Sequence, residues 1–347
     1  MTRILTLFLI VFSVISCKTD KASKSFVTAK IKQFKMDSCS IRAIHSVSND
    51  TLYYADSKGN IGHTFDNGQS WSKTSIKYND SLVPHFRSIA VNNDTVFALS
   101  VANPALLYKT FNKSTELVYK EEHSKVFYDS MHFLDDGKHA IAVGDPTENC
   151  PSIIVSSDYG NTWCKLSCDE LPEFEEGEAF FAASNTNIKT LGNTIWIVSG
   201  GKKARVLKSS DMGKNWNIYT TPIVQGNGPQ GIYSVDFYDQ NNGIIFGGNY
   251  SNPEDNCANK AITKDGGKTW TLIADNQEPG YKSCVKYVPN SKGQEIVAIG
   301  KTGISYSKNG GENWNKISDI PFYTIQFVNE HSAWLGGPEK LGKLILN

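Results

Sequence analysis

Arginine is scarce in this chain: of 35 lysine and arginine residues, four are arginine, at positions 3, 42, 87 and 205. The 35 acidic residues leave no formal net charge. A protein that binds nucleic acid needs basic side chains clustered on one face to contact the phosphates. The composition therefore argues against a nucleic-acid partner.

Motifs for metals and nucleotides are also missing. The seven histidines are scattered, with no His-x-His, His-Glu-x-x-His or Cys-x-x-Cys arrangement, so no metal site is expected. Gly226-x-Gly228-x-x-Gly231 matches a dinucleotide-binding fingerprint in spelling, but residues 232–237 alternate as a strand. Phosphate capture by that fingerprint needs a helix N-terminus at this point. We therefore expect no cofactor, and nothing supports a nucleotide-dependent oxidoreductase.

Long apolar runs are confined to the first residues. Residues 4–15 are apolar apart from Thr6 and Ser13, which is too short for a membrane-spanning helix and typical of an export signal. Val14-Ile15-Ser16-Cys17 fits the lipobox of bacterial lipoproteins. It predicts a signal peptide over 1–16, lipidation of Cys17 and a flexible tether over 17–25. An ordinary signal peptide with a chance cysteine is the alternative. We expect a chain exported to the bacterial cell envelope and lipid-anchored there, in the outer membrane on its periplasmic or surface face.

The sequence does contain a repeat. Ser209-x-Asp211-x-Gly213-x-x-Trp216 recurs in variants, including a worn copy, Thr110-x-Asn112-x-Ser114-x-x-Leu117. The six copies begin at residues 64, 110, 156, 209, 263 and 307, so they are 46, 46, 53, 54 and 44 residues apart. This is the period of a four-stranded propeller blade. Each copy lies between apolar segments and predicts a hairpin turn, in which hydroxyl and carboxylate oxygens bind free amides, glycine takes a positive φ and tryptophan packs on the hairpin.

The two ends of the chain indicate how a ring of blades would close. Residues 26–36 alternate as one strand, whereas 323–327, 332–335 and 343–346 predict three strands after the last repeat. One strand from the front and three from the back complete a blade and remove open sheet edges. The expected fold is all-β, a single seven-bladed β-propeller over 26–347 whose last blade is closed by the N-terminal strand. A six-bladed ring is the alternative, if the worn repeat forms no blade.

The repeated phrase is similar to the Asp-box, or BNR repeat, of sialidases and other propellers, in which it lies on the outer rim away from the active face. Further phrases over 38–347 resemble secreted bacterial Ycf48/HCF136-like proteins: Phe86-Arg87-Ser88, Gly144-Asp145-Pro146, the run 177–184, Gly247-Gly248-Asn249-Tyr250 and Gly280-Tyr281-Lys282-Ser283. The Ycf48/HCF136 proteins are photosystem II assembly factors that bind its subunits through an arginine-rich patch. The resemblance implies a binding or assembly module, but the patch has no counterpart, since only three arginines follow the signal.

In a propeller, the residues that open each innermost strand ring the mouth of the central channel, and a concave site lined by charges and tyrosines suits binding. A solvated polar rim is the alternative. Insertions at 171–178 and 250–257 lengthen the third and fourth periods, and such loops often carry binding. The candidate residues are Arg42, Arg87, Tyr128, Asp129, Glu178, Gln230, Tyr233, Tyr281, Lys282 and Tyr323.

Two enzyme hypotheses use the same positions. Asp129 and Glu178 would be the facing carboxylates of a glycan-active hydrolase. A true sialidase is not supported, because the Arg-Ile-Pro phrase of those enzymes is absent and Arg87 follows the first repeat. The leading hypothesis is a monomeric binding or assembly module for an envelope protein or glycan that meets the membrane only through its lipid anchor. The hydrolase is the alternative.

Six cysteines follow Cys17, and an exported protein can form disulfides. Cys150 opens the strand that enters the third repeat and Cys168 lies at the far end of the strand that leaves it, so these two are expected to face each other and pair. The partners of Cys39, Cys164, Cys257 and Cys284 are left open, with a free thiol as the alternative for each.

Overall fold

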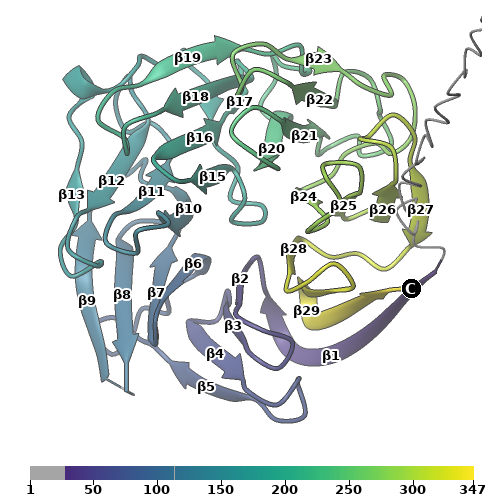
Figure 1. Ribbon diagram of the computed structural model, residues 1–347. Coiled ribbons are helices and arrows are strands. Elements are labelled where there is room, and N and C mark those ends of the chain that lie inside the picture. Colours follow the sequence, from purple (N-terminus) through teal and green to yellow (C-terminus); the bar gives the residue numbers. More distant parts are fainter. Residues whose placement is uncertain (1–27, 113) are drawn as a thin grey trace, which may run out of the picture.

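The computed structural model describes residues 28–112 and 114–347, so the predicted signal peptide, Cys17 and the predicted tether lie outside it. Within this part, seven antiparallel blades stand around a central axis as in a propeller (Figure 1). The helical content of these residues is one 3₁₀ turn, η1 (Cys168–Glu170). None of their helices is long and apolar enough to cross a membrane. The prediction of an all-β, seven-bladed propeller is confirmed.

Six blades follow one another along the chain, each with four strands that are ordered from the central axis outward to the rim. With the innermost strand first, blade 1 contains β2 (Ala43–Ser46), β3 (Leu52–Ala55), β4 (Asn60–Thr64) and β5 (Ser72–Ser75); blade 2 contains β6 (Phe86–Asn92), β7 (Thr95–Ser100), β8 (Ala105–Phe111) and β9 (Ser114–Glu121); blade 3 contains β10 (Tyr128–Phe133), β11 (Ala140–Gly144), β12 (Ser152–Ser156) and β13 (Cys164–Lys165). Blade 4 contains β15 (Ile188–Leu191), β16 (Thr194–Val198), β18 (Arg205–Ser209) and β19 (Asn217–Thr220); blade 5 contains β20 (Gln230–Phe237), β21 (Gly243–Asn249), β22 (Lys260–Thr263) and β23 (Thr271–Leu272); blade 6 contains β24 (Cys284–Tyr287), β25 (Ile296–Gly300), β26 (Gly303–Ser307) and β27 (Asn315–Ser318). Two short strands, β14 (Glu178–Ala179) and β17 (Gly200–Gly201), extend the inner edge of blade 5.

Blade 7 is built from both ends of the described chain: β28 (Thr324–Phe327), β29 (Ser332–Leu346) and β1 (Ala29–Ser40). β1 runs antiparallel to the end of β29, with Ala29 opposite Leu346. β29 folds back near Glu339, whose φ is 52°, so that the Leu346 amide donates to the His331 carbonyl at 2.8 Å. It thus supplies the two middle strands of the blade. The N-terminal strand closes the ring as predicted (Figure 1).

The repeated phrase forms a hydrogen-bonded turn in which one hydroxyl is bonded on two sides. In the first copy, the Thr64 hydroxyl donates to Asp66 at 2.8 Å and accepts from the Gly68 amide at 2.9 Å. Asp66 also accepts from the side chain and the amide of Ser70, and these bonds lower the pKa of Asp66 to about 2. The glycine amide is bound in the same way, at 2.8 to 3.0 Å, by the hydroxyls of Ser156, Ser209, Thr263 and Ser307.

The worn second copy departs from this pattern. Its Thr110 hydroxyl faces the Thr115 hydroxyl at 3.2 Å, and Phe111 of β8 is paired with Ser114 of β9. Blade 2 nevertheless has four paired strands. Strand pairing here depends on the apolar alternation of the strands and tolerates a different turn. The ring therefore has seven blades, and the six-bladed alternative is ruled out.

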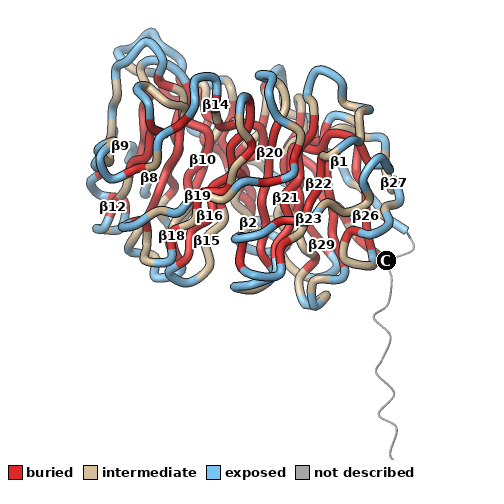
Figure 2. Tube along the Cα trace, turned by 90° about the horizontal axis from the view of Figure 1, so that it is seen from above, coloured by how far each residue is buried: buried red, intermediate tan, exposed pale blue. Residues whose placement is uncertain are grey.

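Apolar side chains fill the spaces between neighbouring blades, and Figure 2 shows this buried band between two exposed rims of loops. Trp196 of blade 4 stacks on Phe237 of blade 5, with ring centroids 3.8 Å apart, and its indole donates to the Gly266 carbonyl at 2.9 Å. Gly160 of blade 3 has no room for a side chain, since a Cβ there would lie 2.5 Å from the Phe97 ring of blade 2. Adjacent blades are therefore packed face to face with little spare room.

The cysteines divide into one pair and four thiols among the described residues. A disulfide joins Cys150 to Cys168, the pair expected from their places around the third repeat, with Cα atoms 5.5 Å apart. The free cysteines are Cys39 and Cys284, which are buried, and Cys164 and Cys257, which are exposed.

Candidate binding site at the channel mouth

A segment of the chain crosses the central axis of the ring. Residues 180–187, here called the plug, lead from β14 to β15 and are almost entirely buried. Two arginines from other blades hold the plug by its backbone. Arg42 donates from Nη1 to the Ala183 carbonyl at 3.1 Å, and Arg87 donates from Nη1 to the Ala182 carbonyl at 3.1 Å.

The far end of the plug is fixed by side chains of its own. Asn185 donates to the Ile89 carbonyl at 2.9 Å and accepts from the Met131 amide at 3.0 Å, so it joins the inner strands of blades 2 and 3. Ser184 donates to the Ser283 carbonyl at 2.7 Å, next to blade 6. The plug therefore ties several blades together at the centre and separates two openings.

The upper opening, on the side where the inner strands begin, is a pocket of about 470 Å³. Arg42 lies over the Tyr323 ring at 3.8 Å, and its buried Nε has no hydrogen-bond partner among the described residues. Burial, and after it the charge of Arg42, lower the pKa of Arg87 to about 10. Within the described chain no carboxylate forms an ion pair with either guanidinium. The pocket is lined by Arg42, Arg87, Phe127, Phe180, Phe181, Ala182, Ala183, Gly228, Pro229, Tyr233, Tyr250 and Tyr281.

Aromatic rings form the other wall of this upper pocket. Phe181 of the plug stacks on Tyr233, with centroids 4.0 Å apart and planes at 5°. Tyr281 meets Tyr233 edge-on at 4.7 Å, and Tyr250 meets Tyr281 edge-on at 5.6 Å. Lys301 lies over the Tyr250 ring at 4.0 Å. These contacts fix the rings, so the pocket offers a preformed apolar surface beside two cationic groups.

Asp129 lies behind the arginines and is completely buried. Neither of its carboxylate oxygens has a hydrogen bond of standard geometry within the described chain. Burial, and then the nearby charge of Asp145, raise the pKa of Asp129, while Arg87 and the Ala182 amide act in the opposite direction. Asp145 accepts from the Phe180 amide at 2.7 Å, and burial raises its pKa to about 6. Two acids thus stand behind the plug.

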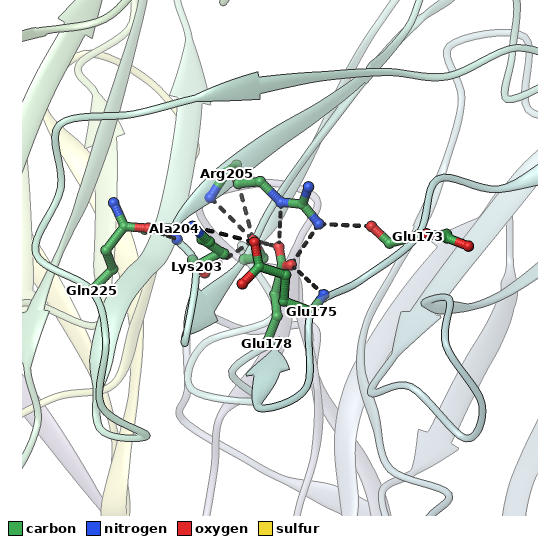
Figure 3. A network of polar contacts seen from close by, with 8 residues as sticks. Glu173, Glu175, Glu178, Lys203, Ala204, Arg205 and Gln225 are labelled. Atoms are coloured by element: carbon green, nitrogen blue, oxygen red, sulfur yellow. Dashed lines mark hydrogen bonds and ion pairs between the residues drawn. The ribbon is translucent and has the colours of Figure 1, made fainter.

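Glu178 does not line the upper pocket and instead belongs to a polar network with Arg205 (Figure 3). Its carboxylate accepts from Arg205 Nε at 2.8 Å and from the Ser199 hydroxyl at 2.6 Å. Arg205 also donates to the Glu173 carbonyl at 2.8 Å. Glu178 is therefore committed to fastening the insertion before the plug onto blade 4. The network borders a side pocket of about 530 Å³ whose walls include Lys125, Asp145, Glu148, Phe174, Glu175, Glu176 and Glu178.

Tyr128 and Lys282 also point elsewhere. The Tyr128 hydroxyl donates to Glu121 at 2.7 Å, toward the rim of blade 2. The Lys282 ammonium donates to Thr302 Oγ1 at 3.1 Å and to the Gly303 carbonyl at 3.0 Å, and burial lowers its pKa to about 8. Both side chains serve packing between strands.

The lower opening is a pocket of about 350 Å³ on the other side of the plug. Its lining includes His45 and His132, and burial lowers the pKa of each to about 4, so both imidazoles are neutral at pH 7. Nearby, Asp236 pairs with Lys189 at 2.8 Å and with Lys286 at 3.4 Å. Over the residues that the structure covers, no group of three or more His, Cys, Asp or Glu side chains could hold a metal ion.

The structure brings together part of the predicted channel-mouth set. Four of its residues line the upper pocket directly, Tyr323 packs on Arg42, and Asp129 lies behind Arg87, whereas Tyr128, Glu178 and Lys282 are engaged elsewhere. The plug and the aromatic rings that it presents were not predicted from the sequence. Tyr250 lay in a recognised insertion and Phe181 in a run singled out for its resemblance. The predicted channel-mouth residues that line the upper pocket directly are Arg42, Arg87, Tyr233 and Tyr281.

No protein-family model and no curated protein matches the chain. Solved structures do match its fold. A structure of Ycf48 bound to D1 peptide has a TM-score of 0.66 at 13% identity and covers 93% of this chain and 98% of that chain. Ycf48 from Cyanidioschyzon merolae has a TM-score of 0.60 at 14% identity, covering 91% and 98%. The WD40 repeats of RRP9 have a TM-score of 0.65 at 10% identity, covering 91% and 97%. At these identities the likeness establishes the propeller fold.

Proposed function

We propose that this chain is a protein-binding β-propeller whose upper pocket takes an acidic segment of a partner, one that also carries an aromatic side chain. The observation that carries the proposal is the pair of guanidiniums, Arg42 and Arg87, which face one pocket without a carboxylate partner in the described chain. Holding like charges together away from water costs free energy, and an anionic ligand relieves that cost. Arginine also matches a carboxylate with two parallel hydrogen bonds.

The aromatic side chains of the upper pocket favour a ligand that carries an apolar or aromatic group beside its acidic group. Phe181, Tyr233, Tyr281 and Tyr250 present apolar faces and edges within the same 470 Å³ as the arginines. Rings held by one another lose little conformational entropy when a further ring or apolar side chain packs on them. The geometry suits a peptide segment in which an acidic residue neighbours an aromatic one.

The comparisons support binding of a protein as the class of function. One of the similar structures is Ycf48 bound to D1 peptide, so a chain of this fold has been seen in complex with a peptide. We carry over from it the kind of ligand and leave the identity of the partner open. We also propose that the repeated turns are Asp-box repeats, which are distantly related to those of sialidases. The turn contacts of Thr64 and its equivalents are compatible with such boxes.

The place of action is proposed from the sequence. The apolar run 4–15 and the lipobox ending at Cys17 support a chain exported to the bacterial envelope and lipid-anchored there, facing the periplasm or the surface. In that setting the propeller would act as a monomeric binding or assembly module. An envelope glycan is the second ligand class from the sequence analysis, and no contact in the pocket favours it over a peptide.

The hydrolase alternative requires two carboxylates that are free to react, and Asp129 and Glu178 are not free. Asp129 is completely buried, and Glu178 is held by Arg205 and Ser199. A glycosidase needs one carboxyl free to protonate the leaving group and a second free to act as nucleophile or base. Neither residue is free to fill either role.

A binding assay tests the proposal. The probe is an acetylated, amidated peptide of three Glu-Tyr repeats, and its matched control has glutamine in place of each glutamate. We expect the acidic peptide to bind and the control to bind much more weakly. Arg42→Gln and Arg87→Gln each keep a donor for the plug but remove the charge. Each should weaken binding by about tenfold or more, because a hydrogen bond to a charged group contributes ~1.5–3 kcal/mol.

Lys214→Gln is the control variant, because this exposed lysine lies in a repeated turn outside the pocket. It should bind the acidic peptide as the unaltered protein does. Circular dichroism melts of all variants report whether the ring is intact. Equal affinity for the acidic and the glutamine peptide, or unaltered binding by both arginine variants, would contradict the proposal.

A further inference from the structure

The carboxyl group of Asp129 is placed to control the upper pocket from behind. Arg87 on β6 and Asp129 on β10 come from neighbouring inner strands and both face Ala182 of the plug. Arg87 donates to the Ala182 carbonyl, whereas Asp129 faces the Ala182 amide. The carboxylate is close enough for its charge to act on Arg87 but forms no ion pair with it. A fully buried acid without a standard hydrogen bond is costly to ionise.

The other charged and titratable groups around this pair are few. Asp145, in the loop after β11, is near enough for its charge to raise the pKa of Asp129. Arg87 is itself faced by Arg42, His85, Tyr250 and Tyr323. Burial, followed by the charges of Arg87 and Arg42, lowers the pKa of His85 to about 4, so that His85 is neutral at and above pH 6.

We propose that Asp129 is an internal counter-ion of Arg87 that competes with the ligand's anion, and that binding of an acidic ligand at high pH is accompanied by uptake of one proton from solvent onto Asp129. The inference rests on the proposed function, because it assigns a means of regulation to the same pocket. With Asp129 protonated, the charge of Arg87 is available to the ligand. With Asp129 ionised, that charge is already neutralised and a second anion is repelled.

The sign of the pH dependence follows from the direction of the shift. Burial and Asp145 raise the pKa of Asp129 above its usual value, so the neutral carboxyl persists to higher pH than in a free aspartate. An anionic ligand raises the pKa further, because it adds negative charge nearby. Affinity should therefore be highest at low pH and fall as pH rises through the Asp129 pKa. The fall is up to about tenfold for each pH unit beyond that value.

Isothermal titration calorimetry tests the inference with the Glu-Tyr peptide between pH 6 and 8.5, where the peptide glutamates stay ionised. Each pH uses two buffers of different ionisation enthalpy, which reports the number of protons taken up. The unaltered protein should take up more protons, and bind more weakly, at the upper end of the range. Asp129→Asn keeps the shape of the neutral acid and cannot ionise. Above pH 7, where Asp145 with its pKa of about 6 is already ionised, the affinity of this variant should be independent of pH with no proton uptake.

Asp145→Asn is the second variant. Removing this acid should lower the pKa of Asp129, so the loss of affinity should begin at lower pH than in the unaltered protein. If Asp129→Asn does not fold, the proton count in the unaltered protein decides alone.

The outcomes separate the two proposals. Absence of acidic-peptide binding at every pH overturns the proposed function and this inference together. Binding without proton uptake in the unaltered protein, or pH dependence that persists above pH 7 in Asp129→Asn, overturns the inference and leaves the proposed function standing.

Discussion

At the scale of single residues, one buried hydroxyl in each complete repeated turn is bonded on two sides. The Ser209 oxygen accepts from the Gly213 amide at 2.8 Å and donates to Asp211 at 2.8 Å. Asp211 in turn accepts from Asn215, whose side chain and amide lower the Asp211 pKa to about 2. The Gly213 amide is inside the turn, where water cannot easily replace a lost partner.

We therefore predict that Ser209→Ala lowers the free energy of unfolding by about 1–3 kcal/mol, the usual cost of leaving a buried donor without a partner. Thr110→Ala is the matched control, because the Thr110 hydroxyl of the worn copy meets the exposed Thr115 hydroxyl and binds no glycine amide. It should change stability little. Urea unfolding followed by tryptophan fluorescence measures both. Equal losses in the two variants would show that the turn hydroxyl is not a special contributor.

At the scale of the element, β1 is held in blade 7 by an aromatic contact as well as by its strand pairing. Phe34 of β1 is buried, and its ring lies 5.8 Å from Trp334 of blade 7 and 5.6 Å from Trp71 of blade 1. It also packs on Gly68, where a Cβ would come within 2.5 Å of the ring. One side chain of the first strand therefore fastens the last blade to the first.

Phe34→Ala should destabilise the ring by about 3 kcal/mol, since it removes a buried aromatic side chain and leaves a cavity between two blades. Lys35→Ala, an exposed neighbour on the same strand, should cost little. Chemical unfolding gives both values, and limited proteolysis should cut the Phe34 variant first within 28–40 if β1 detaches. A Phe34 variant as stable as the Lys35 variant would mean that strand pairing alone closes the blade.

Features formed by residues close together in the sequence could be predicted from the sequence, whereas features formed by contacts between distant residues could not. The turns were predictable because Ser209 and Gly213 lie four residues apart and the phrase repeats. Closure by β1 was predictable because the strands at both ends were incomplete alone. The plug was not, since Arg42 and Ala183 are 141 residues apart and their contact follows no local period. For the same reason, the sequence placed Glu178 at the channel mouth without its partner Arg205.

At the scale of the whole molecule, the upper pocket is a product of ring closure. Arg42, Arg87 and Tyr233 belong to three different blades, and the plug of blade 4 meets all of them at the centre. The plug is in turn anchored from below by Asn185, on the opposite side from the pocket. Binding at the upper mouth should therefore depend on a residue that no ligand there can touch.

Asn185→Ala tests this dependence. The change leaves the Met131 amide and the Ile89 carbonyl without their partner, and should cost about 2 kcal/mol in unfolding free energy. It should also weaken binding of the Glu-Tyr peptide several-fold, because Ala182, Ala183 and the two arginines lose their fixed positions. Asn193→Ala, at an exposed turn of the same blade, should alter neither quantity. A variant that loses stability but binds the peptide as before would show that the arginines and rings hold their places without the plug, and that the pocket depends on the blades alone.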